Sequence, residues 1–148
     1  IVPTLRIMHK RLSPLGSQTY DQQIKSLEKA FAAGAKIAMG TDQSHRLLTG
    51  ENLVELAYMV EFLDMTPMEA IVSATETAAQ CLNVSDAGTL AAGKLADVVV
   101  FDGDPLADIA AMREAGRFHL VMKEGEVFKD TLAEGAARRP AEEKRASA

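Results

Sequence analysis

Two short apolar runs without polar alternation, at residues 1–5 and 35–40, stand on either side of an amphipathic stretch. Such runs are typical of strands that are covered on both faces, as in parallel sheets. Between them, apolar side chains recur at helical spacing, which predicts a helix from about residue 17 to residue 33. The apolar stripe of this helix consists of Tyr20, Ile24, Leu27 and Phe31. Gly34 follows, where a helix often ends in a left-handed residue.

Two further helices are predicted between residues 53 and 82. The first carries one apolar face, formed by Leu53, Leu56, Ala57, Val60 and Leu63. The second begins with Thr66, Pro67 and Glu69, which together make a capping box with proline at the first helical position. Its buried side is expected to consist of Ile71, Ala74, Ala78 and Leu82. The order strand, helix, strand, helix, helix favours an α/β unit with parallel strands.

From about Val84 onward, turns and short strands replace the long helices. Turn residues and Val-rich runs predict several short elements in this part. These are strands at 89–90 and 96–101, a short helix at 109–115, and a hairpin of residues 118–122 and 126–129 around Glu124 and Gly125. The expected domains are therefore an α/β part at residues 1–83, a β unit at residues 84–130, and a tail at residues 131–148. The tail is expected to be disordered, and the alternative is a docked helix.

Composition excludes several classes of function. With 47% hydrophobic and 25% charged residues, the 148-residue chain can bury a core. Its net charge of −5 argues against nucleic-acid binding, because a phosphate-binding surface needs clustered Lys and Arg. No run approaches the roughly 18 apolar residues of a membrane span. A single cysteine excludes an internal disulfide and any metal site with several cysteines.

The chain opens at Ile1, inside what looks like a buried strand. A domain seldom begins within its own sheet, so we expect residues to be missing upstream and this chain to be the C-terminal part of a longer protein. Any signal peptide would also lie upstream. The compartment is therefore unknown, and it would be cytoplasmic only if no such signal precedes Ile1.

The strongest candidate for chemistry is Asp42, in the sequence Gly40-Thr41-Asp42 at the end of an apolar run. A strand of a parallel barrel presents catalytic side chains at its carboxyl end in this way. The alternative is that Asp42 caps a turn or a helix, as many aspartates do. His45 and Arg46 follow on the same loop as candidate substrate-binding residues, since Arg46 can pair with a carboxylate through two hydrogen bonds. Alternatively, both are ordinary exposed loop residues.

The other chemically active side chains have simpler explanations. His9 is interpreted as a solvated loop histidine and His119 as a structural residue of the hairpin. Cys81 is interpreted as a small buried hydrophobic residue. Three scattered histidines do not have the spacing of a zinc motif.

Four segments, in order, resemble the C-terminal portion of the metal-dependent amidohydrolase superfamily, in its imidazolonepropionase-like and Xaa-Pro dipeptidase-like branch. They are Val2-Pro3-Thr4-Leu5; Ile37-Ala38-Met39-Gly40-Thr41-Asp42; Thr66-Pro67-Met68-Glu69-Ala70-Ile71 with Ala74-Thr75; and Gly88-Thr89-Leu90 running into Gly93-Lys94-Leu95-Ala96-Asp97-Val98-Val99-Val100. Each segment is weak alone, but the ordered set, which spans about residues 1–129, is a strong signal.

The resemblance implies an α/β fold, the C-terminal part of a (β/α)₈ barrel of the TIM type followed by part of a β-sandwich. Residues 1–5 would be the seventh strand and residues 35–41 the eighth. Of the superfamily's metal-site residues, only the aspartate of the eighth strand lies in this chain, at Asp42. Asp42 would then be both a metal ligand and the general acid/base, and one or two Zn²⁺ ions would be held mostly by residues outside this chain.

The resemblance further implies a hydrolase for amide or peptide C–N bonds. A dipeptidase or carboxypeptidase is the first hypothesis, and a cyclic-amide hydrolase of the imidazolonepropionase type is the second. A hypothesis of another class is a non-catalytic scaffold or assembly module. The expected partners are a small amide or peptide substrate and either a second copy of the chain or a complementing N-terminal half. No nucleic acid and no membrane are expected, and this chain alone is expected to be inactive.

Overall fold

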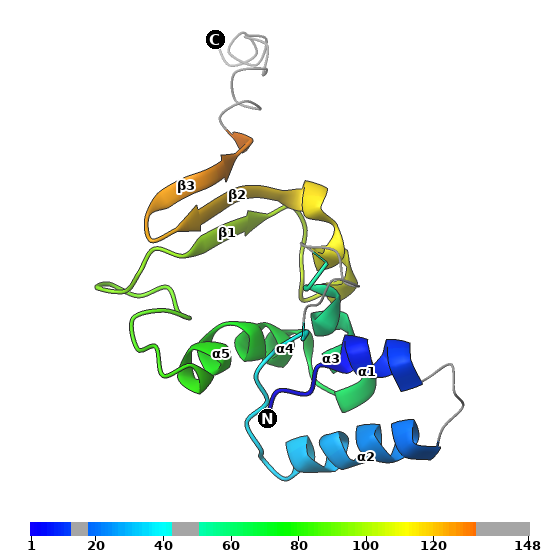
Figure 1. The fold of residues 1–148 in the computed structure, drawn as a ribbon. Coiled ribbons are helices and arrows are strands. Elements are labelled where there is room, and N and C mark those ends of the chain that lie inside the picture. The colour runs from blue at the N-terminus through cyan, green and yellow to red at the C-terminus, as the bar shows by residue number, and fades with distance from the viewer. Residues whose placement is uncertain (13–17, 43–50, 133–148) are drawn as a thin grey trace, which may run out of the picture.

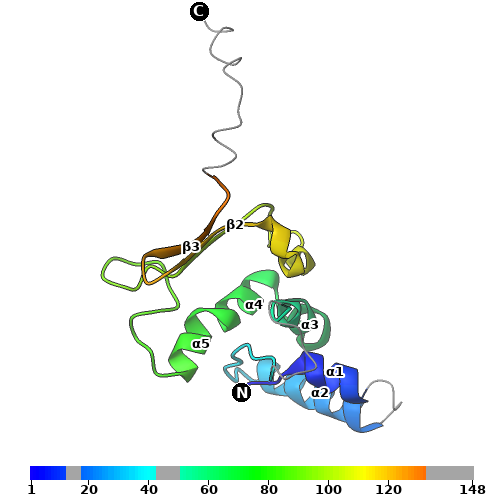
Figure 2. The same ribbon diagram turned by 45° about the horizontal axis from the view of Figure 1, so that its top comes forward.

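The computed structural model describes residues 1–12, 18–42 and 51–132. Helices come first along the chain, and a small sheet follows them (Figure 1). The helices are α1 (Leu5–Leu12), α2 (Gln18–Ala32), α3 (Val54–Leu63), α4 (Pro67–Ala74) and α5 (Glu76–Cys81). The strands are β1 (Val98–Phe101), β2 (Phe118–Lys123) and β3 (Glu126–Asp130), with the short 3₁₀ helices η2 (Ile109–Arg113) and η3 (Ala115–Arg117) before β2. In Figures 1 and 2 the sheet lies on one side of the helices, facing α4 and α5 across the molecule.

Residues 1–4 and 35–42 are extended, but neither segment forms a regular strand. They nevertheless pair at one point in the manner of parallel strands. The amino group of Ile1 donates to the carbonyl of Lys36 at 2.8 Å, and the amide of Ala38 donates to the carbonyl of Ile1 at 2.8 Å. Two bonds that flank Ile37 in this way are the unit of a parallel ladder. The two segments are therefore neighbours, as predicted. The two predicted strands are wrong, because α1 already begins at Leu5 and residues 35–40 do not form a regular strand.

The other edge of the segment at residues 35–42 is covered by α4. The amide of Met39 donates to the carbonyl of Ser73 at 3.0 Å. This carbonyl is accessible because α4 ends at Ala74 and the backbone breaks at Thr75, with φ −119° and ψ −90°. The single helix predicted from Thr66 onward is thus two helices, α4 and α5.

The break also changes which side chains are buried. Ala70, Ser73 and Ala79 face the interior, whereas Leu82, expected on the buried side, is 75% exposed. A helical stripe keeps its phase only along an uninterrupted helix, so the apolar spacing predicted the first part of this face better than the second. Cys81 is likewise exposed at the end of α5, which corrects its interpretation as a buried residue.

The core lies between α1, α3, α4 and the extended segment that contains Ile37. It consists of Leu5, Ile37, Leu56, Met59, Leu63, Met65, Ala70 and Ile109. The predicted stripe of α2 packs against this cluster through Ile24, Leu27 and Phe31. The predicted capping box of α4 is present, with the Glu69 amide donating to the Thr66 hydroxyl at 3.3 Å and the Thr66 amide donating to the Glu69 carboxylate at 2.8 Å.

The sheet is antiparallel, in the order β1-β2-β3. Met122 pairs with Val127 and Lys123 with Glu126, so Glu124 and Gly125 form the two-residue hairpin turn that the sequence predicts. Both turn residues have positive φ, 52° and 84°, as a type I′ turn requires. The strand predicted at residues 89–90 is not formed, and the helix predicted at residues 109–115 is divided between η2 and η3.

Substitution of Gly40 tests the contact between the two extended segments. A Cβ at residue 40 would lie 2.4 Å from Cγ1 of Val2. We expect Gly40→Ala to lower the free energy of unfolding by about 1 kcal/mol, because the added methyl group overpacks this contact. Urea unfolding followed by circular dichroism measures the effect.

The double variant Val2→Ala/Gly40→Ala is the control, since it removes the colliding methyl group. It is expected to unfold close to where Val2→Ala alone unfolds. If Gly40→Ala costs as much in the Val2→Ala background as in the parent protein, the two segments do not touch as described.

Candidate functional site

Asp42 lies at the carboxyl end of the extended segment, as the sequence predicts, and its side chain is exposed. Ile37 and Ala38, earlier in the segment, are each only 3% exposed, so the backbone is fixed in the core just before it reaches Asp42. Asp42 itself is left-handed, with φ 48°. Aspartate tolerates this conformation better than most residues. The segment therefore presents one carboxylate to solvent at the end of a firmly held backbone.

The neighbouring segment ends in a similar way. Thr4 has φ 49° and is followed directly by helix α1. For a β-branched residue a positive φ is a genuine outlier, because its side chain crowds the backbone there. Both extended segments thus leave their pairing through a left-handed residue, Thr4 in one and Asp42 in the other. His45 and Arg46, the predicted substrate-binding residues, lie outside the described residues.

The described residues do not form a metal site by themselves. Among residues 1–12, 18–42 and 51–132, no three His, Cys, Asp or Glu side chains are grouped so that they could hold a metal ion. The carboxylate of Asp42 is a suitable donor for a zinc ion, but a zinc site needs three or four protein ligands. Asp42 can therefore serve only as one member of a larger ligand set.

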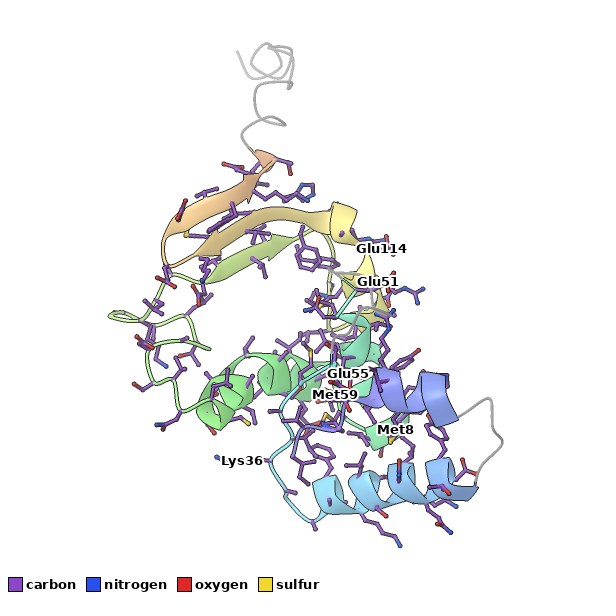
Figure 3. All side chains as sticks on the ribbon, viewed as in Figure 1. Met8, Lys36, Glu51, Glu55, Met59 and Glu114 are labelled. Carbon is purple, nitrogen blue, oxygen red and sulfur yellow. The ribbon has the colours of Figure 1, made fainter. Side chains whose placement is uncertain are left out.

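Sequence reasoning overlooked Glu55, whose side chain is fully buried in the first turn of α3. Its carboxylate accepts hydrogen bonds from the backbone amides of Leu5 and Arg6, the latter at 2.9 Å. These amides belong to the first turn of α1, whose N–H groups have no partner within the helix. Figure 3 shows Glu55 beside Met59, where α3 faces α1. A glutamate four residues before a buried methionine, on a helix whose one other charged residue is Glu61, was the available signal for its burial.

Burial shifts the pKa of Glu55. Desolvation raises the pKa of this carboxyl group, and the amide hydrogen bonds from Arg6 and Leu5 and the positive charge of Arg6 oppose the rise without cancelling it. The Arg6 guanidinium itself is engaged elsewhere. It donates to the carbonyl of Glu51 at 2.6 Å and pairs with the Glu51 carboxylate. Arg6, Glu51, Val54 and Arg113 line a cavity of about 240 Å³ beside this network.

His9 corrects another expectation, because it is part of helix α1 and not of a loop. Its Nδ1 lies 2.9 Å from the hydroxyl of Tyr20. Its ring packs against Tyr58 and Phe62, with centroids 5.3 and 5.4 Å away. His119 is in strand β2 as predicted, and its Nδ1 lies 2.8 Å from the hydroxyl of Thr131. None of these contacts of the two histidines involves Asp42.

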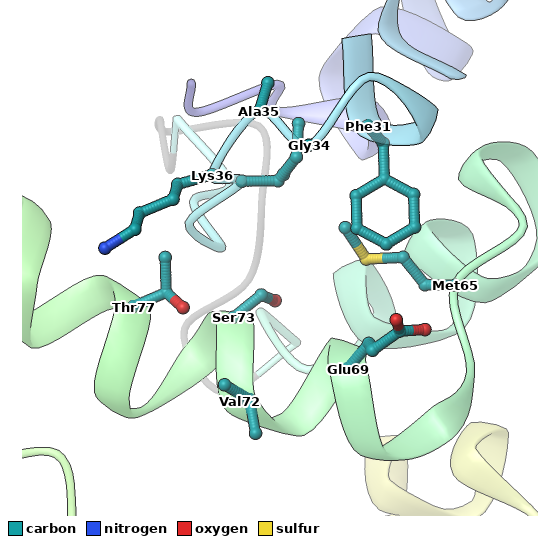
Figure 4. A pocket seen from close by; sticks show the side chains of 10 residues that line it. Phe31, Gly34, Ala35, Lys36, Met65, Glu69, Val72, Ser73 and Thr77 are labelled. Atoms are coloured by element: carbon teal, nitrogen blue, oxygen red, sulfur yellow. The ribbon is translucent and has the colours of Figure 1, made fainter. Parts of the chain in front are cut away.

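A second cavity, of about 230 Å³, lies at the other end of the segment that contains Asp42 (Figure 4). Its walls include the side chains of Phe31, Met65 and Val72, and Lys36 and Glu69 lie at its margin. The Glu69 carboxylate is occupied by the capping box of α4. This cavity is separated from Asp42 by the length of the segment and is not part of the candidate site.

The amidohydrolase family model matches residues 5–128 of the sequence. The chain belongs to the amidohydrolase family. Ochratoxinase from Aspergillus niger is 36% identical over 111 residues, covering 74% of this chain and 22% of that protein. Imidazolonepropionase from Pyrobaculum arsenaticum is 38% identical over 95 residues, covering 63% of this chain and 24% of that protein. The resemblance seen in the four sequence segments is confirmed.

Solved structures of this amidohydrolase group share the fold of the chain. The crystal structure of A. niger ochratoxinase matches with a TM-score of 0.78 and 30% identity, over 87% of this chain and 32% of that one. A Xaa-Pro dipeptidase with bound methionine in its active site matches with a TM-score of 0.73 and 32% identity, over 86% of this chain and 34% of that one. The chain thus spans less than a quarter of the curated relatives and about a third of the solved chains. Within the described residues, no helix of this amidohydrolase chain has the length and apolar character needed to cross a bilayer.

The raised pKa of Glu55 predicts a pH-dependent stability. Between the ordinary value of 4.5 and the raised pKa, the native protein binds the proton more tightly than the unfolded chain does. The contribution of Glu55 to the unfolding free energy therefore falls as the pH rises through this window. We expect the stability of the parent protein relative to Glu55→Gln to decline over the same window, measured by urea unfolding at a series of pH values.

Glu69→Gln is the matched control with the opposite sign. The amide and then the hydroxyl of Thr66 lower the pKa of Glu69, so its contribution is present above 4.5 and is lost as the pH falls through the lowered pKa. Slopes of the same sign for the two variants would contradict this assignment.

Proposed function

We propose that this chain is the C-terminal part of an amidohydrolase that cleaves an amide or peptide C–N bond, and that Asp42 is its metal ligand and general acid/base. The family match over residues 5–128, together with the exposed carboxylate at the end of a buried extended segment, carries the proposal. The proposal assigns the remaining ligands to parts of the fold outside this chain, since the described residues supply one carboxylate and no complete metal site.

The proposed architecture is a (β/α)₈ barrel in which residues 1–4, which precede α1, and residues 35–41 occupy the places of the seventh and eighth strands. The parallel hydrogen bonds at Ile1 support this arrangement. Residues 84–130 would belong to a composite sandwich. The sheet exposes much apolar surface, with Val99 55%, Val127 49% and Phe128 65% exposed. Exposed apolar surface of this kind favours contact with a further part of the protein or with a partner.

In the proposed mechanism, Asp42 accepts a proton from water and later donates it to the leaving group. A bound zinc ion would supply a water molecule whose pKa is close to 7. The Asp42 carboxylate would orient that water and accept its proton as the water attacks the carbonyl carbon. The same carboxyl group would then deliver the proton to the leaving nitrogen, which departs as an amine. Exposure at the end of a held backbone suits both steps, because the carboxylate reaches reacting atoms without moving the core.

A dipeptide is the favoured substrate class. The 32% identity and TM-score of 0.73 to the Xaa-Pro dipeptidase support this choice. The second candidate is a cyclic amide, favoured by the 38% identity to an imidazolonepropionase. His45 and Arg46 are the proposed substrate-binding residues, since they follow Asp42 by three and four positions and Arg46 can pair with a substrate carboxylate.

Substitution of Asp42 tests the proposed role directly. In the full-length protein that carries this chain, we expect Asp42→Asn to lower kcat at least about 100-fold, because the amide cannot transfer the proton. Release of amino acids from a panel of Xaa-Pro and Xaa-Phe dipeptides measures turnover. Asp64→Asn is the control, since Asp64 is also exposed and left-handed, with φ 56°, but ends helix α3. An Asp42→Asn protein with most of its turnover would remove Asp42 from the mechanism.

Zinc binding by the isolated chain tests whether this chain holds a complete metal site or contributes only one ligand to it. One carboxylate offers too few ligands, so we expect the 148-residue chain to bind Zn²⁺ weakly, with no stoichiometric zinc left after dialysis. Metal analysis of the dialysed chain measures this. Tight stoichiometric zinc that depends on described residues other than Asp42 would refute the proposed distribution of ligands.

A further inference from the structure

We propose that Glu55 is a positioning residue for the reaction assigned to Asp42, acting through the backbone at Thr4, Leu5 and Arg6. The inference rests on the proposed function of Asp42. It concerns the one charged side chain that is fully buried among the described residues. Glu55 holds the end of the extended segment that lies next to the one ending in Asp42.

The carboxylate of Glu55 is buried. A buried charge is costly unless hydrogen bonds and opposite charges compensate it. Both oxygens of Glu55 are used, one by the amide of Leu5 and the other by the amide of Arg6. The positive end of the α1 dipole faces the same carboxylate. The side chain is therefore fixed at a single position, and it fixes the backbone it binds.

The backbone at Thr4 would be free to change its conformation without Glu55. Thr4 precedes the bound amides and has a left-handed conformation that β-branched residues avoid, with φ 49°. Such a conformation persists only where the surroundings enforce it, and it is often found at functional sites. The two hydrogen bonds to Glu55 begin at the next residue, Leu5, and are well placed to enforce it. Loss of these bonds would let Thr4 relax.

The pairing of the two extended segments connects Thr4 with Asp42. Ile1 is paired with Lys36 and Ala38, so the two extended segments run in parallel toward their left-handed ends. The side chain of Val2 already lies against Gly40, two residues before Asp42. A shift of the Thr4 backbone would therefore act through Val2 on the backbone at Gly40, two residues before Asp42. Arg6, whose amide donates to Glu55, is held in addition by the ion pair between its side chain and Glu51.

A purely structural role is the competing explanation, because any helix cap stabilises its protein. Glu69 provides the matched comparison. It also accepts a hydrogen bond from a backbone amide at the beginning of a helix, that of Thr66 before α4. The cavity that Glu69 lines, however, lies at the opposite end of the segment from Asp42. A structural role predicts a loss of stability without a loss of turnover for either glutamate, whereas positioning predicts an effect on turnover for Glu55 alone.

The experiment compares Glu55→Gln and Glu69→Gln in the full-length protein, at a temperature where both variants remain folded by circular dichroism. On the dipeptide that the parent protein hydrolyses fastest, we expect Glu55→Gln to lower kcat about 10- to 100-fold with little change in KM, as for a misplaced catalytic group. Hydrogen exchange should accelerate at the amides of Leu5 and Arg6. Glu69→Gln should leave kcat within about 2-fold of the parent, since the hydrogen bonds of Glu69 are with Thr66 and not with the backbone at Leu5 and Arg6.

Should Glu55→Gln fail to fold, Glu51→Gln replaces it, because the Glu51 side chain is 46% exposed and tolerates substitution. It is expected to lower kcat in the same manner but by less. Faster exchange at Leu5 and Arg6 with unchanged kcat would overturn the inference and leave a structural cap. A loss of kcat in Glu55→Gln combined with full turnover in Asp42→Asn would instead refute the proposed function and, with it, the role of Glu55 toward Asp42.

Discussion

The backbone hydrogen bonds on both edges of the segment that ends in Asp42 are the constraint on which the rest of the structure depends. Ile1 satisfies one edge and the carbonyl of Ser73 the other. Ala38 and Ser73, which take part in these bonds, are buried, so the segment cannot slide without leaving their backbone groups without partners. The break after Ala74 makes the Ser73 carbonyl accessible, and the segment held on both edges ends at the exposed Asp42.

Local signals in the sequence predicted the elements that are stabilised locally. The stripe of α2, the capping box at Thr66 and Glu69 and the turn at Glu124 and Gly125 are all present. In each case, residues three or four positions apart, or a two-residue turn, contain the interaction that forms the element. The ordered segments around Asp42 likewise indicated the amidohydrolase family, which the match over residues 5–128 confirms.

Interactions between distant residues were not predictable in this way. Glu55 binds amides 49 and 50 residues away, and no pattern in a short window reveals such a partner. The same applies to the bond from Met39 to Ser73, which coincides with the break between α4 and α5. Helix α1 was missed because it has only 8 residues and its first turn is capped by a side chain from α3. The position of Asp42 at the end of a buried segment was therefore predictable from the sequence, whereas the residue that anchors the adjacent segment was not.

Asp42 is proposed to contribute its carboxylate to a metal centre whose other ligands lie outside this chain. A crystal structure of the full-length protein, with anomalous data collected at the zinc edge, tests this assignment. We expect an anomalous peak with an Asp42 carboxylate oxygen about 2.0–2.2 Å away. A metal ion fully coordinated by other residues, with the Asp42 side chain directed away from it, would remove Asp42 from the metal site.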